Sequence, residues 1–222
     1  MVRLFLLLVF LFPTSGDAAR LRKHTNFKSA QKIVPGRAKI VIDPGHGGDD
    51  FGTKVGHTIE KVINLKTAEY VAALLRKSGF EVLMTRKKDV FISLADRVDL
   101  ANRSKASLMV SIHFNAAQSK EAEGLEIFYF KDPILERKNH SKNLADLVMR
   151  FVLNLTKAKS RGVKTGNFCV IRDTQIPSIL VEGGFLTNER ELEKIRQDQY
   201  LKSLAQGIVD GIEAYLKPIH GS

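Results

Sequence analysis

Short, nearly continuous apolar runs alternate along the chain with longer segments in which apolar residues recur every three or four positions. The runs are typical of strands covered on both faces of a sheet, and the recurring pattern is typical of amphipathic helices. The pattern predicts strands at 38–42, 80–85, 108–112, 125–130, 168–171 and 178–181, and helices at 60–78, 93–104, 143–155, 189–196 and 199–216. This alternation predicts the α/β class, with a single domain whose twisted, mostly parallel sheet is flanked by helices.

The N-terminal segment reads differently from the rest of the chain. The apolar run Leu4–Phe12 follows Arg3 and ends before Pro13, and it is shorter than the about 20 residues that cross a bilayer. Gly16-Asp17-Ala18 offers a small-residue cleavage site, so the segment is typical of a secretory signal peptide. We predict a signal peptide at 1–18, a basic linker at 19–37, a globular domain at 38–217 and a tail at 218–222. The protein is then exported, to a periplasm or cell envelope.

The formal net charge is +11, with 44% hydrophobic and 27% charged residues. The composition suits a buried core, and the positive charge favours acidic partners. Basic residues are scattered and do not interleave with aromatic ones, which disfavours nucleic acid as the partner. For an exported protein we expect an anionic envelope polymer or membrane surface instead.

One cysteine and three histidines carry no predicted chemistry. Cys169 is the single cysteine, which excludes an internal disulfide, and its apolar neighbours predict a small buried hydrophobe rather than a nucleophile. His24, His140 and His220 lie in polar segments, and we expect them to be solvated.

Polar residues stand where three of the predicted strands end. His46 follows the first strand in I-V-I-D-P-G-H-G-G, within a long Gly-rich loop at 43–58. His113 ends V-S-I-H, and Glu182 ends I-L-V-E. Functional loops of open α/β sheets gather at the carboxyl ends of strands. We therefore expect these three side chains to meet in one site.

Two histidines and one carboxylate that leave a fourth position open are a donor set typical of hydrolytic zinc sites. His46 and His113 supply the imidazoles, and Glu60, in the first turn of a predicted helix, supplies the carboxylate. His57 lies three residues before Glu60, and spacing alone leaves both open as the third ligand.

Glu182 is the candidate base. It follows Ile179-Leu180-Val181 and precedes two glycines, so burial should raise the pKa of its carboxyl toward that of a general base. The alternative is a structural hydrogen bond to a neighbouring loop. Because metal-assisted hydrolysis needs such a base, we predict that Glu182 is catalytic.

The glycines of the first loop have two interpretations. Gly45, Gly47 and Gly48 allow left-handed backbone and close approach of the main chain to a bound group. A plain tight turn needs the same residue type. No Gly-Lys-Ser/Thr follows and no G-x-G-x-x-G opens a helix, so a phosphate loop is excluded.

With these motifs together, the chain resembles the zinc-dependent N-acetylmuramoyl-L-alanine amidases, a family of exported bacterial cell-wall enzymes. The resemblance covers about residues 39–216, through V-I-D-P-G-H-G-G, an acidic residue opening a helix, S-I-H-F-N-A, R-G-V-K-T-G-N-F-C-V-I-R and L-V-E-G-G-F-L-T-N. It implies zinc on His46, Glu60 and His113, with Glu60 favoured over His57, and Glu182 as the catalytic carboxylate. It also implies a twisted, mostly parallel sheet.

The resemblance implies cleavage of the amide between N-acetylmuramic acid and L-alanine in peptidoglycan, for wall remodelling or cell division. Some members carry a long helix that covers the zinc, inserted after the strand equivalent to 125–130. Here only residues 131–140 separate that strand from the next predicted helix, so we expect an open site that needs no activator protein. We expect no wall-binding module beside the domain, with surface charge as the anchor.

Alternative functions remain open on the sequence. One is another zinc peptidase, deacetylase or carboxypeptidase, acting on peptidoglycan stem peptides or another amide. Another is a non-catalytic peptidoglycan-binding protein, which would have no use for the base. Ser29-Ala30-Gln31-Lys32, with two later motifs, also mimics serine penicillin-binding enzymes. We interpret that pattern as coincidence in a Lys-rich chain, which a β-lactam label on Ser29 would contradict.

Overall fold

The computed structural model describes residues 38–217. The predicted signal peptide, basic linker and tail lie outside the described residues, as do His24, Ser29 and His220. Within the described part of the chain, no helix is both long and apolar enough to cross a membrane.

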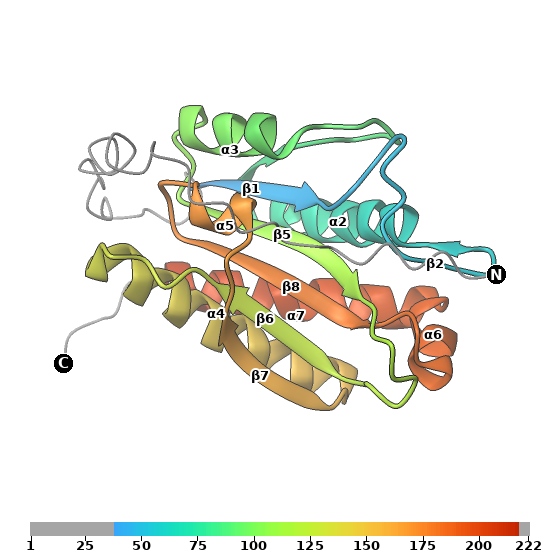
Figure 1. Ribbon diagram of the computed structural model, residues 1–222. Helices are drawn as coiled ribbons and strands as arrows, with labels where there is room; N and C mark the ends of the chain where they lie inside the picture. The colour runs from blue at the N-terminus through green and yellow to red at the C-terminus, as the bar shows by residue number, and fades with distance from the viewer. Residues whose placement is uncertain (1–37, 218–222) are drawn as a thin grey trace.

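A six-stranded sheet forms the centre of the domain, in the order β4-β1-β5-β8-β6-β7 (Figure 1). Its strands are β1 (Lys39–Pro44), β4 (Glu81–Met84), β5 (Leu108–Asn115), β6 (Leu125–Tyr129), β7 (Ser160–Thr165) and β8 (Ser178–Phe185). All neighbours are parallel except β6 and β8, which are antiparallel. The prediction of a mostly parallel α/β sheet is confirmed.

Helices cover both faces of this sheet. They are α2 (Glu60–Lys77), α3 (Leu94–Arg103), α4 (Leu135–Thr156), α5 (Cys169–Arg172), α6 (Glu189–Ile195) and α7 (Asp198–Leu216). Residues of α2, α4 and α7 pack with Ile40 and Val110 in the larger core cluster. Residues of α3 and α5 pack with Val41 and Met109 in the smaller one. Because successive side chains of a strand point to opposite faces, the two clusters lie on opposite sides of the sheet.

Helices α4 and α7 approach each other closely at two glycines. A Cβ added at Gly207 would lie 2.6 Å from the Cα of Val152, and one at Gly211 would lie 2.5 Å from the Cα of Val148. Glycine therefore sets the spacing of the two helices that form much of the larger core.

Several expectations about local structure are wrong. The segment 168–171, predicted as a strand, belongs to the one-turn helix α5, where Phe168 accepts backbone bonds from Ile171 and Arg172. Its apolar run reflects burial against the sheet, since the Phe168 ring packs edge-on against Phe128 with centroids 5.2 Å apart. Cys169 is half-buried there, with Sγ 3.3 Å from the Asp173 carboxylate.

The helix predicted at 143–155 begins eight residues earlier, at Leu135. Its first turns bury Arg137, which pairs with Asp132, instead of an apolar stripe. The sequence does not predict strand β7, because S-R-G-V-K-T has no apolar run. Its residues are exposed or half-buried in the structure. His140 is not simply solvated: it is half-buried, with Nδ1 3.0 Å from the Tyr215 hydroxyl.

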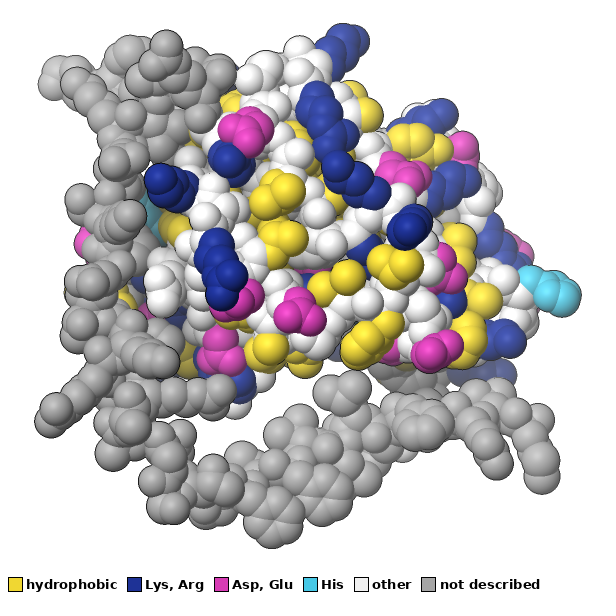
Figure 2. All heavy atoms as spheres, turned by 90° about the horizontal axis from the view of Figure 1, so that it is seen from above, with side chains coloured by type: hydrophobic (Ala, Val, Ile, Leu, Met, Phe, Trp, Pro, Cys, Tyr) yellow, Lys and Arg dark blue, Asp and Glu magenta, His cyan; other side chains and the backbone are white. Residues whose placement is uncertain are grey.

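The loop predicted at 43–58 also contains structure. Its far end forms a small hairpin of β2 (Lys54–Val55) and β3 (Thr58–Ile59). On the face of the molecule seen in Figure 2, Lys and Arg side chains are spread out and acidic side chains lie among them. On that face the positive charge is dispersed, in keeping with the scattered basic residues of the sequence.

Candidate metal centre

The loop after β1 holds His46 in an unusual backbone conformation. His46 has φ 61°, in the left-handed region, and is followed by Gly47 and Gly48 with φ of 133° and 60°. A non-glycine residue there costs on the order of 1–2 kcal/mol. The loop is fixed by bonds from Gly45 N–H to the Ile112 carbonyl (3.0 Å) and between Gly47 and Asp50.

Two buried arginines hold the carbonyl groups of this loop. Arg97 donates to the carbonyls of Pro44 and His46, each at 2.7 Å, and Arg86 donates to the carbonyl of Gly45 at 2.8 Å. Arg97 also pairs with the buried Asp43 at 2.7 Å. These bonds offset the cost of the strained backbone and fix the position of the His46 side chain.

Asp43 is therefore a structural carboxylate. Burial alone would raise its pKa, but the Arg97 charge and hydrogen bonds from Thr85, Ser111 and Arg97 outweigh burial and lower it. The hydroxyls of Thr85 and Ser111 donate to it at 2.6 and 2.7 Å. Asp43 lies at the end of a strand near His46 in the sequence, as a site residue would. Its side chain instead holds Arg97, which fixes the loop.

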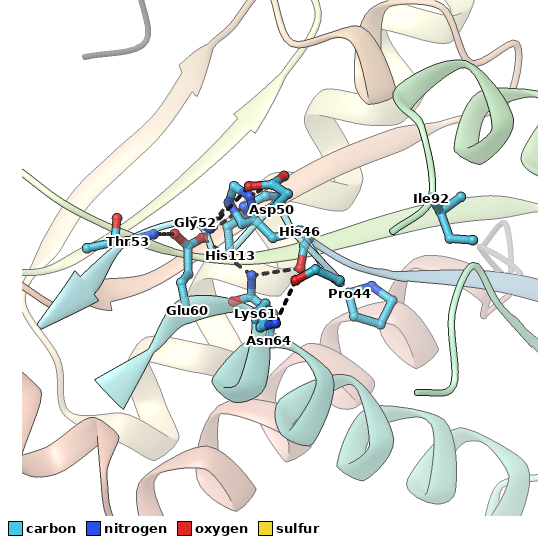
Figure 3. A network of polar contacts seen from close by, with 12 residues as sticks. Pro44, His46, Asp50, Gly52, Thr53, Glu60, Lys61, Asn64, Ile92 and His113 are labelled. Carbon is cyan, nitrogen blue, oxygen red and sulfur yellow. Dashed lines mark hydrogen bonds and ion pairs between the residues drawn. The ribbon is translucent and has the colours of Figure 1, made fainter. Parts of the chain in front are cut away.

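His46 from the loop after β1, Glu60 from α2 and His113 from β5 come together (Figure 3). Glu60 Oε1 lies 3.1 Å from His46 Nε2 and 3.1 Å from His113 Nδ1. One donor atom from each residue lies within 4.8 Å of the others. The two imidazole rings meet edge to face, with centroids 4.9 Å apart.

The Glu60 carboxylate is held at the first turn of α2. Its Oε2 accepts the Thr53 backbone N–H at 2.8 Å, and its Oε1 accepts Asn64 Nδ2 at 3.3 Å. Burial would raise the pKa of Glu60, but hydrogen bonds and charge from His113 and His46 lower it far below its ordinary value. The carboxylate is thus ionised, as a metal ligand must be.

His46 is oriented by a second carboxylate. Its Nδ1 lies 2.8 Å from Asp50 Oδ2, which leaves Nε2 facing Glu60. Burial would lower the pKa of His46, but Glu60 and Asp50 together raise it. A carboxylate behind a metal-binding histidine fixes its tautomer and ring orientation. His57, the alternative to Glu60, lies exposed in the turn between β2 and β3, outside this cluster.

Two glycines make room for the cluster. A Cβ on Gly45 would fall 2.1 Å from the His113 ring. A Cβ on Gly52 would fall 2.5 Å from Glu60 Oε2 and 2.7 Å from the His46 ring. Gly45 is one of the three glycines expected to allow close approach, and the group that approaches it is a side chain of the cluster itself.

Glu182 lies beside the cluster on the neighbouring strand. It is paired in register with His113 across β5 and β8. Its Oε2 is buried and has no hydrogen-bond partner within the described residues. Burial, followed by the charges of Glu60 and Glu126, raises the pKa of Glu182 well above its ordinary value. A carboxyl with a raised pKa and an unpaired oxygen can accept and release a proton.

A second buried carboxylate, that of Glu126, lies beside Glu182 and is not identified by the sequence analysis. Glu126 pairs with Glu182 across β8 and β6, and its side chain is buried. It accepts bonds from Asn115 (3.3 Å), Arg161 and Lys164 (2.8 Å). The one signal in the sequence is an acidic residue inside the apolar run L-E-I-F-Y.

The donor chemistry fits zinc. Two imidazole nitrogens and one carboxylate oxygen are the set found in hydrolytic zinc sites. Ligand atoms of one tetrahedral zinc ion lie roughly 3.4 Å apart, from metal–ligand distances near 2.1 Å. The two 3.1 Å separations around Glu60 are close to that spacing.

Comparison with known proteins identifies the family. Residues 40–214 match the family described as N-acetylmuramoyl-L-alanine amidase. The N-acetylmuramoyl-L-alanine amidase LytC of Bacillus subtilis (strain 168) is 38% identical over 178 residues, covering 80% of this chain. The match covers 35% of LytC, so the chain spans about a third of that relative's length.

Solved structures agree with this match. An N-acetylmuramoyl-L-alanine amidase from Clostridium difficile 630 is 40% identical with a TM-score of 0.77, covering 82% of this chain and 97% of that one. The CwlD amidase from Clostridioides difficile, solved in complex with the GerS lipoprotein, is 32% identical with a TM-score of 0.76, covering 81% and 98%. With these matches and the sheet described above, the chain belongs to the N-acetylmuramoyl-L-alanine amidase family.

Proposed function

We propose that this protein hydrolyses, with zinc, the amide that joins N-acetylmuramic acid to L-alanine in peptidoglycan. The reaction would serve wall remodelling or cell division after export of the protein to the cell envelope. The observation that supports it most is the joint position of His46, Glu60 and His113 beside Glu182, whose buried Oε2 has no hydrogen-bond partner among residues 38–217.

His46, Glu60 and His113 would hold the metal. Zinc bound there supplies Lewis-acid chemistry, polarising the scissile carbonyl and making water a better nucleophile at neutral pH. Asp50 keeps Nε2 of His46 turned toward Glu60. Arg97 keeps the backbone of His46 in place through the His46 carbonyl. The site is then organised before substrate arrives.

Glu182 would move the proton. The raised pKa of its carboxyl makes it a stronger base than an ordinary glutamate. It takes a proton from the attacking water and delivers it to the leaving amine of L-alanine, so one residue serves both halves of the reaction. Because no described residue forms a hydrogen bond with its Oε2, no such bond has to break for this transfer.

We also propose that the site is open and needs no activator protein. Only residues 130–134 separate β6 from α4. Helix α4 packs on the face of the sheet that carries α2 and α7, away from the face of His113 and Glu182. The complex with a lipoprotein belongs to CwlD. Purified protein with zinc should therefore digest sacculi alone, and inactivity until a cell extract is added would contradict this.

Digestion of purified sacculi tests the function itself. We expect mass spectrometry to find free lactyl groups on the glycan and stem peptides beginning with a free L-alanine amine. Cuts between amino acids of the stem would instead identify a peptidase or carboxypeptidase. Binding to sacculi without new ends would identify a non-catalytic binding protein. Edman sequencing of the protein recovered from the envelope tests export and the cleavage site predicted after residue 18.

A further inference from the structure

A row of polar side chains leads from the metal centre to the edge of the sheet. Across β5, β8 and β6, His113 pairs with Glu182 and Glu182 pairs with Glu126. Glu126 in turn holds Arg161 and Lys164 of the edge strand β7. Neighbouring strands lie about 4.8 Å apart, so the row spans roughly 14 Å over three strand spacings.

The antiparallel pairing of β6 explains why the row reaches the site. Strand β8 runs toward Glu182 at the edge where the metal centre lies, and β6 begins at that same edge with Glu126 near its start. Leu180 and Phe128, two residues from Glu182 and Glu126, pack in the smaller core cluster. Because side chains alternate between faces, the row lies on that cluster's face of the sheet.

The far end of the row carries more positive than negative charge. Arg161 and Lys164 share the single carboxylate of the buried Glu126. Their side chains remain 37% and 39% exposed. The Arg161 guanidinium also lies 5.0 Å from the centre of the Phe185 ring, three residues after Glu182. One positive charge is thus left over, on side chains that solvent can partly reach.

We propose that Arg161 and Lys164 form a subsite for a carboxylate of the peptide substrate, with Glu126 as the positioning residue that holds both cations in the row. The inference rests on the proposed function, because the row starts at the proposed reaction centre. A span of ~14 Å corresponds to roughly four residues of extended peptide. The subsite would therefore take an acidic residue among the first few after the scissile amide.

The charges of the row fit a substrate better than a purely structural role. One cation is enough to neutralise a buried carboxylate such as Glu126, and a second brings a further cost in side-chain entropy. Stem peptides of peptidoglycan carry free carboxylates beyond L-alanine. A charged hydrogen bond from a partly desolvated Arg or Lys to such a group adds both affinity and register.

Paired substrates provide the test. Soluble muramoyl peptides would carry either a free carboxylate or an amide at the acidic residues of the stem. We expect wild-type protein to prefer the free acids by about tenfold, mainly in KM. Arg161→Gln and Lys164→Gln should each reduce that preference. Lys159→Gln, which removes an exposed cation paired with Glu123, is the matched control and should keep it.

The outcomes separate the two proposals. If wild-type protein cleaves neither substrate, the proposed function fails, and equilibrium binding of the same peptides still tests the subsite. If both are cleaved with equal KM, or if both variants keep the wild-type preference, the subsite is wrong and Arg161 and Lys164 only brace β7. The substrate preference of Lys164→Gln and that of Arg161→Gln are measured separately, so the test still stands on one variant if the other misfolds. Thermal unfolding and zinc content check each variant.

Discussion

Arg97 and Asp43 form an ion pair in which both side chains are almost wholly buried, 3% and 1% exposed, with Nη1 and Oδ1 2.7 Å apart. The same guanidinium donates to the carbonyl of His46. The pair therefore connects the core of the sheet to a proposed metal ligand.

We expect Arg97→Met to destabilise the fold by about 3–5 kcal/mol, because it leaves the Asp43 carboxylate buried without its partner. Urea unfolding measures the change. Arg103→Met, which removes an exposed ion pair on the same helix, should change stability little. Equal losses of unfolding free energy in the two variants would show that the buried pair stabilises the fold no more than the exposed one.

Acid should weaken the fold through Asp43. Its pKa is lowered in the folded protein, so its stabilising contribution is present above the unfolded pKa, near about 3.9, and is lost as pH falls through the folded value. We expect the urea midpoint to fall below about pH 4. Asp43→Asn should be less stable than the wild type at neutral pH. Its urea midpoint should lack the part of the acid decline that comes from protonation of Asp43. An unchanged acid slope would assign the decline to other carboxylates.

Glu182→Gln should separate chemistry from metal binding. Glutamine keeps the size of the side chain but cannot accept the proton, so we expect turnover to fall roughly 10²–10⁴-fold. Zinc content, measured by mass spectrometry of the metal, should remain at the wild-type level. Glu193→Gln, an exposed position on α6, serves as the control. Retained turnover would remove Glu182 from the reaction.

Asp50→Asn should weaken zinc binding through His46. The carboxylate that accepts from Nδ1 would be replaced by a neutral amide, and such changes behind a histidine ligand cost about 10–100-fold in metal affinity. Competition with a chromogenic chelator measures the affinity. Asp49→Asn, at the exposed neighbouring position, should leave it unchanged. Equal affinities of the two variants would count against Asp50 as the residue that orients His46.

Two glycine substitutions should fail in different ways. Gly45→Ala places a methyl group 2.1 Å from the His113 ring, so we expect loss of zinc from a protein that still folds. Gly211→Ala places one 2.5 Å from the Val148 backbone and should cost about 1–3 kcal/mol of stability. The folded fraction of Gly211→Ala should keep its zinc. Circular dichroism melts and metal analysis distinguish the two results.

The strands and cluster residues that the sequence predicts share one property: their signal is local. β1, β5 and β8 are apolar runs with both faces covered, and His46, His113 and Glu182 are polar residues in or just after such runs. In contrast, Glu126 and Arg161 are in contact although they lie 35 positions apart in the sequence. No local pattern in β7 predicts that contact. The strand predicted at F-C-V-I is wrong for the same reason. The burial of this segment comes from packing against β6 rather than from strand pairing.

β7 is the last strand of the sheet, paired only with β6 among the described strands. Such an edge presents unpaired backbone groups on which another chain could add a strand, and charged side chains along it discourage that association. We therefore expect Arg161 and Lys164 also to oppose self-association at this edge. We expect the wild-type protein to stay monodisperse at high concentration and variants that lack these charges to associate, which light scattering measures.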